Sequence, residues 1–540
     1  MTEREPTQSS SAGWPLVAIF LGAFLLVAFT AGHYGVTWDE PNYFHASDLH
    51  IQWFKQFFDG VGRGDPRAAL DDAKIKELWH WDPYHVPHPP FSRIVSGVTK
   101  TLFAPYMDKI TAYRLGPALF FGLLAALMYA WMSSLFDRVT GLFSALACVL
   151  VPNLFGFAHF AMTDMPLTAM WFATVYCFWR GVENWKWSIA LGVVWGLALA
   201  TKFPALLLPI PLLLWAHLYH RKSYSNNIFC MVFLSPVVMI AMQPYMWHQP
   251  FLRVLEFVYE GISRGYRTET NFTVFFFGRL YFSDALPKFF PFFMTAVTQP
   301  ETLLALSFIG IATIHRRGRQ RPTLILFLLS GLFILGTGVL PGAVLHDVNR
   351  IMLPSIPFFI ALAGAGFFAA TGYLTERVGR FSAMEGILHL RGKIAGALLF
   401  LALLPPAMDL LNYHPYELSY YNRMVGGIRG AYRRGLELTY LGEVFTPTFI
   451  DFLNKKLPAG AVVNTSQTNF IFEFYQDEGR LRKDIKITDA ASFDYYILLN
   501  RRSAFTLVDR NFLLTRPSLY AHVDLYDVPL IYIYEGKGNR

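Results

Sequence analysis

The chain has 540 residues, of which 54 % are hydrophobic and only 16 % are charged. Soluble domains carry about 25 % charged residues, so this composition excludes an ordinary soluble protein and indicates a polytopic membrane protein. The net charge of +8 is compatible with nucleic-acid binding, but Lys and Arg gather in short links between apolar runs, as the positive-inside rule expects. We therefore predict a lipid-bilayer protein with no nucleic-acid partner.

Residues 1–13 are polar and are predicted to form a short disordered cytoplasmic tail. Apolar runs of about 16 to 22 residues follow, which is the length of membrane-spanning helices. The least regular run, at 187–219, is interrupted at Thr201-Lys202-Phe203-Pro204, where proline favours a helix break. Eleven spans are predicted, at about 14–33, 113–135, 141–159, 164–181, 187–202, 203–219, 227–246, 301–315, 322–341, 351–372 and 393–411.

The charges in the links between spans predict the orientation of the chain. If the N-terminus is cytoplasmic, every second link is short and basic, as at Arg138, Arg180 and 315–321. Short loops decide topology, whereas long segments cross the membrane regardless of charge. The sequence therefore predicts a multi-pass protein of the inner (plasma) membrane with a cytoplasmic N-terminus and a periplasmic or extracellular C-terminus. The long segments then lie outside, at 34–112, 247–300 and 412–540.

These outer segments differ in character. Within 34–112, Phe44, Ile51 and Phe54 recur at helical spacing, which indicates a helix lying in the membrane interface. From about residue 440 the sequence becomes that of a soluble domain, with a helix in "TPTFIDFLNKKLPAG" and strands in "AVVNTS", "FDYYILLN" and "PLIYIYEG". We predict a membrane catalytic domain at 14–411, including the outer loops 34–112 and 247–300, and a small extracytoplasmic α/β domain at 412–540.

Acidic and basic side chains recur at the outer ends of the predicted spans. Each has a simple structural explanation when taken alone: the acids precede or open helices as caps do, and Lys202 can extend to the interface. Together, groups of both signs at one depth predict a polar cavity that is open to the outer leaflet. The candidate acidic residues are Asp39, Glu40 and Asp164. The candidate basic residues are His88, Arg93, Lys202, His346 and Arg350.

A lipid-linked phosphosugar fits this combination of groups. Its phosphate would meet the cations, and its polyprenyl chain would lie among aromatic spans. Transfer of the sugar needs one general base to take the proton of an acceptor hydroxyl, and cations that neutralise the leaving phosphate. This differs from a glycosidase, which uses two carboxylates as acid and base. Two carboxylates can also hold a divalent metal, but the chemistry requires none, so we expect no cofactor and no metal site.

Several motifs occur in the order found in a known family: "TWDEPNYFHASD" after the first span, then "HPPF", "AYRLGPALF", "TDMPL", "TKFPALLLPIP" and "RIMLPSIPFFIALAG". Over about residues 14–411 the chain resembles the GT-C membrane glycosyltransferases, in the branch of bacterial protein O-mannosyltransferases and the lipid A aminoarabinose transferase. The resemblance implies a GT-C fold and an inverting transferase that uses a polyprenyl-phosphate sugar outside the cytoplasm.

The resemblance also implies roles for individual residues. Asp39 matches the critical catalytic carboxylate of the family, with Glu40 beside it, and Asp164 matches the Asp at the start of a later span. His88 stands where the family has the lysine of "KPPL", a phosphate contact. Because His binds phosphate only when protonated or as a neutral donor, Lys202, Arg93 or Arg350 would carry that charge instead.

The stretch 413–443 resembles a bacterial subgroup of these enzymes, which usually has "YWG" where this chain has Tyr440-Leu441-Gly442. Its aromatic and amide side chains suit sugar or acceptor binding, and they suit equally a linker that packs the C-terminal domain onto the membrane part. The candidates are His414, Glu417, Tyr420, Tyr421 and Asn422.

Two other classes of function were weighed against a glycosyltransferase. A secondary transporter would be expected to show repeated halves with paired broken helices, which the sequence lacks. A non-catalytic membrane receptor or assembly protein would not require acids such as Asp39 and Asp164 on separate spans. The sequence names neither the sugar nor the acceptor, which can be a glycan, a lipid or a protein.

Overall fold

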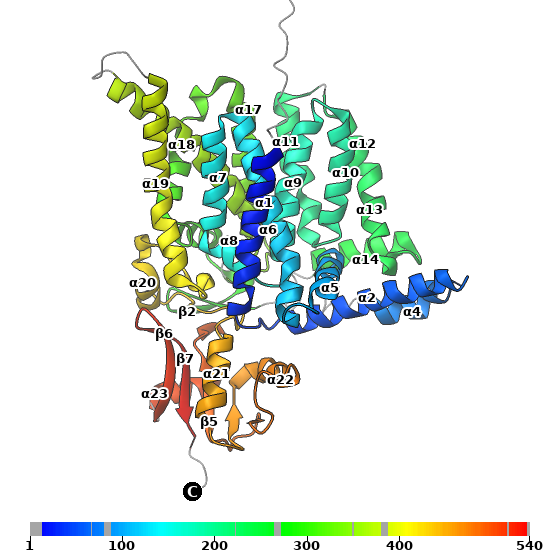
Figure 1. Ribbon diagram of the computed structural model, residues 1–540, viewed down its shortest axis with the longest axis vertical. Coiled ribbons are helices and arrows are strands. Elements are labelled where there is room, and N and C mark those ends of the chain that lie inside the picture. Colours follow the sequence, from blue (N-terminus) through cyan, green and yellow to red (C-terminus); the bar gives the residue numbers. More distant parts are fainter. Residues whose placement is uncertain are drawn as a thin grey trace, which may run out of the picture.

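The computed structural model describes residues 13–65, 67–79, 88–221, 223–263, 272–347, 350–379, 387–515 and 518–536, so the predicted tail lies, except for Gly13, outside the described residues. Most of the chain is a bundle of roughly parallel and antiparallel helices (Figure 1). Those that run along the bundle are α1 (Gly13–Thr30), α6 (Lys109–Leu135), α7 (Arg138–Leu150), α8 (Pro152–Phe157), α9 (Asp164–Gly181), α10 (Trp185–Leu199), α11 (Pro209–Tyr219), α12 (Ser225–Phe229), α13 (Ser235–Ala241), α16 (Glu301–Ala312), α17 (Arg321–Thr337), α18 (Ile356–Gly379) and α19 (Ile387–Tyr413).

Every one of the eleven predicted apolar runs overlaps with one or more of these helices. Among the described residues, five helices are long and apolar enough to cross a membrane by length and composition. They cover Gly13–His33, Lys109–Leu135, Gly318–Thr337, Leu353–Val378 and Arg391–Tyr413. Five shorter apolar helices of 10–17 residues stand beside them in the bundle. The structure thus bears out a multi-pass helical membrane protein, while the total of eleven crossings stays a prediction.

The predicted interruption near Pro204 is present. Helix α10 ends at Leu199, Phe203–Leu207 forms a 3-10 turn, and α11 begins at Pro209. Proline has no backbone N–H and constrains the residue before it, so it favours a break in the helix at this point. The backbone of Lys202 is extended, which places its side chain at the break in the helix.

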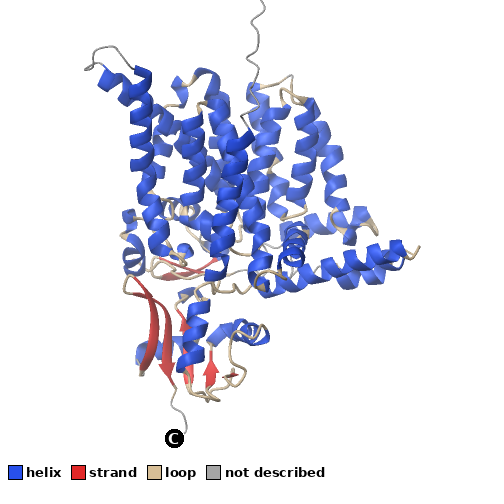
Figure 2. Cartoon of the chain, in the orientation of Figure 1, coloured by secondary structure: helices blue, strands red, loops and turns tan. Residues whose placement is uncertain are grey.

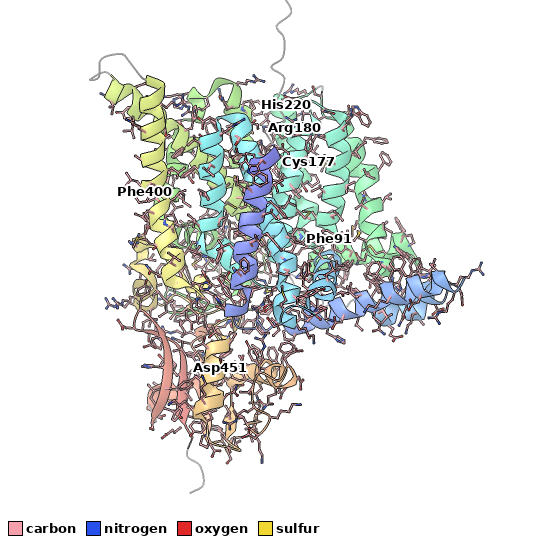
Figure 3. The ribbon with its side chains drawn as sticks, viewed as in Figure 1. Phe91, Cys177, Arg180, His220, Phe400 and Asp451 are labelled. Atoms are coloured by element: carbon pink, nitrogen blue, oxygen red, sulfur yellow. The ribbon has the colours of Figure 1, made fainter. Side chains whose placement is uncertain are left out.

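The long segments gather at one end of the bundle, here called the domain end (Figure 1). The predicted interface helix is α2 (Glu40–Gly62), which with α3 (Arg67–Leu70), α4 (Asp72–Leu78) and α5 (Phe91–Phe103) forms the first of them. The second holds α14 (Pro250–Ser263), the hairpin β1 (Thr273–Phe276) and β2 (Arg279–Phe282), and α15 (Phe290–Val297). Arg180 and His220, from predicted cytoplasmic links, lie at the opposite end, far from Asp451 of the C-terminal domain (Figure 3).

A mixed sheet forms the C-terminal domain, and these strands lie entirely beyond the helical bundle (Figure 2). The strand order is β4-β3-β5-β7-β6, in which β3 pairs in parallel with β4 and β5, and β7 pairs antiparallel with β5 and β6. The predicted helix and three strands are α21 (Pro447–Lys456), β3 (Val462–Asn464), β5 (Tyr495–Leu499) and β7 (Val528–Glu535). Four elements were not predicted: α22 (Asn469–Asp477), β4 (Lys486–Ile487), α23 (Leu507–Thr515) and β6 (Leu519–Leu525).

The link between α1 and α2 is bonded to the C-terminal part of the chain. Gly35 N–H donates to the Glu443 carbonyl at 3.1 Å, and Trp38 N–H donates to the Leu441 carbonyl at 2.9 Å. A Cβ atom on Gly35 would come within 2.6 Å of the Glu443 carbonyl oxygen, so only glycine fits there. Short α20 (Gly427–Arg433) lies in the connection between the bundle and the sheet domain.

A buried ion pair fixes the same link from the bundle side. Arg114 of α6 donates to Glu40 at 2.8 and 2.7 Å, and also to the carbonyls of Ala31, Tyr34 and Gly35. Glu40 also accepts the backbone N–H of Ala161 at 3.0 Å. Both side chains are almost completely buried. The pair therefore determines the path that the chain takes out of α1 and into α2.

Replacing Glu40 with Gln is predicted to destabilise the protein by about 3–5 kcal/mol, because it leaves the buried Arg114 guanidinium without its counter-ion. Thermal unfolding of the purified protein in detergent measures this. The matched control is Glu256→Gln, which breaks a partly exposed pair with Arg253 and is expected to change stability by at most about 1 kcal/mol. Equal effects of the two substitutions would contradict a structural role for Glu40.

Candidate active site

A cavity of about 820 Å³ lies at the domain end. One wall is apolar and comes from the 3-10 turn after α10, from α14 and from α17, with Phe203, Leu207, Phe257 and Ile334. The polar wall brings together predicted residues from four distant segments: Asp39, His88, Lys202, His346 and Arg350. The cavity is thus both large enough and amphipathic enough for a ligand with a polar head and an apolar chain.

Asp39 stands at the first turn of α2, but it does not act as a helix cap. Its side chain makes no capping hydrogen bond, although Pro41 follows in the first turn as expected. Instead, Asp39 Oδ2 accepts a short hydrogen bond from Arg350 Nη2 at 2.5 Å. The Asp39 side chain is 30 % exposed, so the carboxylate is both held by a cation and open to the cavity.

Asp164 is the first residue of α9 and lies behind Lys202 and Arg350. Lys202 Nζ contacts Asp164 Oδ1 at 2.8 Å, and Arg350 Nε donates to Asp164 Oδ2 at 3.2 Å. Asp164 is almost fully buried, in the first turn of α9 after the N-cap residue Thr163. Its position indicates that it orients the two cations rather than contacting a ligand itself.

The polar wall also contains Asp347 and Arg501, which were not predicted from the sequence. Asp347 pairs with Arg350 Nη1 at 3.3 Å, with Arg501 Nη2 at 3.0 Å and with His346 Nδ1 at 2.8 Å. Burial raises the pKa of Asp347, but the charges of Arg501, His346 and Arg350 outweigh burial and hold its pKa well below its usual range. Asp347 follows the predicted site residue His346 directly in "LHDVNRIMLP", so the sequence could have indicated it. Arg501 follows a strand of the soluble domain, and no sequence pattern marks it as a site residue. Glu260 of α14 also lines the cavity.

Arg93 is buried behind the cavity wall and is not among its lining residues. Arg93 Nη2 donates to the His88 carbonyl at 2.7 Å, and its guanidinium lies 5.8 Å from the centre of the Tyr43 ring. Burial lowers the pKa of Arg93 to about 10, which still leaves it charged at neutral pH. Its place beneath His88 and Tyr43, which both line the cavity, indicates a supporting role rather than the expected direct phosphate contact.

Glu40 requires a correction. We expected it beside Asp39 as a second catalytic carboxylate, but it points the other way, into the ion pair with Arg114. Successive residues in the first turn of a helix project about 100° apart, so adjacent acids reach different environments.

The five candidates in 413–443 also lie away from the cavity, each bonded within the protein. His414 bonds Glu417 at 2.7 Å, Tyr420 donates to Asp409 at 2.9 Å, and Tyr421 donates to the Glu437 carbonyl at 2.7 Å. Asn422 donates to the carbonyls of Ala296 and Gln299. The described contacts therefore favour the alternative of a packing linker over the expected sugar or acceptor site.

The charged groups in and behind the polar wall are joined in a network of ion pairs, in which His346 also contacts Asp347. Three carboxylates, Asp39, Asp164 and Asp347, are paired with three cations, Lys202, Arg350 and Arg501. Within the described residues, no group of three or more His, Cys, Asp or Glu side chains could hold a metal ion. The expectation that no metal is needed stays a prediction.

Comparisons with known proteins agree with this architecture. Residues 87–248 match the family model described as dolichyl-phosphate-mannose-protein mannosyltransferase. That stretch includes His88, Arg93, Asp164 and Lys202, but neither Asp39 nor Arg350. No curated protein sequence matches the chain significantly.

Solved structures show a similar fold. The crystal structure of ArnT from Cupriavidus metallidurans bound to undecaprenyl phosphate aligns with a TM-score of 0.51 and 14 % identity, over 97 % of this chain and 98 % of that chain. The archaeal oligosaccharyltransferase AglB from Archaeoglobus fulgidus, in complex with an inhibitory peptide and a dolichol-phosphate, aligns with a TM-score of 0.50 and 9 % identity. That alignment covers 88 % of this chain and 65 % of AglB. The resemblance to GT-C membrane glycosyltransferases is confirmed.

Asp347→Asn is predicted to lower the stability of the protein near pH 7, because Arg501 and Arg350 lose a shared counter-ion. The folded-state pKa of Asp347 lies below that of the unfolded chain, about 4, so its contribution is present above pH 4 and is lost as pH falls further. Thermal unfolding between pH 7 and pH 3 should show the gap between wild type and variant narrowing below about pH 4. The exposed Asp451→Asn is the control; a gap that stays constant with pH would contradict the assignment.

Proposed function

We propose that this protein is an inverting glycosyltransferase that moves a sugar from a polyprenyl-phosphate-linked donor to an acceptor hydroxyl at the outer face of the membrane. The observation that carries the proposal is Asp39, a partly exposed carboxylate held by Arg350 at the wall of the cavity. The fold shared with ArnT and AglB supports it. The domain end is then the outer end, and the basic links lie in the cytoplasm of a cell that carries the protein in its inner membrane.

The donor fits the two walls of the cavity. Its polyprenyl chain lies along the apolar wall, and its phosphate meets Lys202 and Arg350. Both cations are held by Asp164 on the side away from the cavity. Fixed cations stabilise the negative charge that develops on the departing phosphate, without the reorganisation that water would need.

Asp39 is the general base in this mechanism. The acceptor hydroxyl attacks the anomeric carbon from the face opposite the phosphate, and its proton passes to Asp39. The bond between the anomeric carbon and the phosphate oxygen breaks, and the electron pair leaves with the polyprenyl phosphate. One displacement inverts the anomeric configuration, and no general acid is needed because the phosphate is a weak base.

The acceptor is selected by the part of the cavity that the C-terminal domain lines. This part contains Gln467, Ser503 and Phe505. Amide, hydroxyl and aromatic groups suit a hydroxylated acceptor, which can belong to a glycan, a lipid or a protein. The mechanism uses no metal ion or other cofactor.

Asp39→Asn is predicted to reduce product formation at least about 100-fold, because the amide cannot accept the proton of the acceptor. Cells lacking this protein are complemented with wild type or variant, and their glycans and lipids are compared by mass spectrometry. The control is Asp48→Asn on the same helix, which pairs only with Lys100 among the described ion pairs. The proposed function is wrong if Asp39→Asn restores the missing sugar as well as wild type does.

Lys202→Gln is predicted to weaken binding of undecaprenyl phosphate about tenfold or more, because a charge-assisted contact contributes about 1.5–3 kcal/mol. Gln still donates a hydrogen bond toward Asp164, which limits the loss of stability. Native mass spectrometry of the purified protein with added lipid measures the binding. Lys100→Gln, which removes a surface cation near Asp48, controls for non-specific charge effects, and equal affinities of the two variants would contradict the phosphate site.

A further inference from the structure

The C-terminal domain reaches the cavity through the loop that follows β5. Residues Arg501, Ser503, Ala504 and Phe505 of this loop line the cavity. Arg501 is only 8 % exposed, which is unusual for an arginine outside a bundle of helices. Such burial requires that its charge and its hydrogen-bond donors be matched by fixed partners.

Each part of the Arg501 guanidinium has a partner. Nη2 pairs with Asp347 Oδ1 at 3.0 Å, Nε donates to Ser503 Oγ at 3.1 Å, and Nη1 donates to the Tyr440 carbonyl. The guanidinium carbon lies over the Trp38 ring, 4.1 Å from the ring centre. Arg501 therefore contacts the residue next to Asp39 and the carboxylate that also holds Arg350.

The loop itself is anchored on two sides, so Arg501 is a fixed contact. Glu437 accepts the backbone N–H groups of Arg502 at 2.8 Å and Ser503 at 2.9 Å. Thr273 Oγ1 of the β1–β2 hairpin donates to the Ser503 carbonyl at 2.7 Å. The loop is thus tied to the linker and to the membrane part at once.

We propose that Arg501 is a positioning residue of the active site: it fixes Asp39 through the Trp38 ring and fixes Arg350 through Asp347. The C-terminal domain then completes the catalytic geometry as well as lining the acceptor side. This inference rests on the proposed function, in which Asp39 is the base and Arg350 meets the donor phosphate.

The proposal requires a planar guanidinium. A guanidinium can lie over an aromatic ring, direct an N–H to a carbonyl and pair with a carboxylate by charge, whereas an ammonium group is a compact point charge without this fixed geometry. Arg501→Lys therefore keeps the charge beside Asp347 but loses the fixed geometry at Trp38. This substitution separates positioning from simple charge balance.

The experiment compares Arg501→Lys, Arg501→Met, Trp38→Leu and the double variant Trp38→Leu/Arg501→Lys in the full-length protein. Arg502→Lys is the matched control, because the Arg502 side chain contacts the Phe275 and Tyr432 rings and is not among the residues that line the cavity. Three quantities are measured: product in complemented cells per amount of folded protein, binding of undecaprenyl phosphate by native mass spectrometry, and amide hydrogen exchange of residues 35–40.

Positioning predicts that Arg501→Lys loses product about 100-fold while its affinity for undecaprenyl phosphate stays within about threefold of the wild-type value. Exchange in residues 35–40 becomes faster, and the double variant is no worse than the more damaging single variant, because both substitutions break one contact. Arg502→Lys matches wild type. If the Arg501→Met protein does not fold, the results for Arg501→Lys and Trp38→Leu are sufficient to test the positioning role of Arg501.

Three results would overturn the inference: normal product from Arg501→Lys, losses that multiply in the double variant, or weakened lipid binding with normal product at saturating lipid. The last outcome would make Arg501 a direct ligand of the phosphate. Failure of the proposed function has a separate signature, since product would then persist in Asp39→Asn whatever Arg501 variants do. The hydrogen-exchange result reports on the Arg501–Trp38 contact independently of activity.

Discussion

The guanidinium of Arg350 joins three carboxylates that come from different parts of the chain, and the site depends on this junction. It bonds Asp39 at the start of α2, Asp164 at the start of α9 and Asp347 in the connection between α17 and α18. A buried charge must have its partners in place, so none of these three segments can shift alone without a large energetic cost. The starts of α2 and α9 and the connection between α17 and α18 are therefore fixed relative to one another, and these three segments determine the shape of the polar wall.

Much of this arrangement was predictable because it follows from local chemistry. Apolar runs specify the bundle, basic links and long segments alternate between its ends, and acids and bases at span ends converge on one cavity. The choice between Asp39 and Glu40 was not predictable in the same way, because it depends on Arg114, which lies 74 positions after Glu40. Likewise, the polar and aromatic side chains of 413–443 have the composition of a sugar-binding site, but in the folded protein they form hydrogen bonds with neighbouring protein groups.

The C-terminal domain shows even more clearly that local sequence does not predict contacts between distant segments. One helix and three strands of this domain follow from their periodicity and turn residues, whereas the role of Arg501 depends on its contacts in the folded protein. An arginine after a strand in a soluble domain is ordinarily a surface residue. Here its guanidinium lies over the Trp38 ring and pairs with Asp347. No local sequence pattern connects these two residues of the membrane part to Arg501. Sites built across a domain boundary are hidden from a reading of either part alone.

The bonding of the α1–α2 link to the C-terminal part also sets an order of events during biosynthesis. Val36 N–H donates to the Tyr475 hydroxyl at 2.7 Å, across 439 positions of sequence. At a synthesis rate of about 5–20 residues per second, roughly 20–90 s separate the appearance of these two partners. Until Tyr475 has been made, the α1–α2 link lacks this contact, although Arg114 and Arg350, the partners of Glu40 and Asp39, have already been synthesised. The bonds between the α1–α2 link and the C-terminal part can therefore form only after most of the chain has been synthesised.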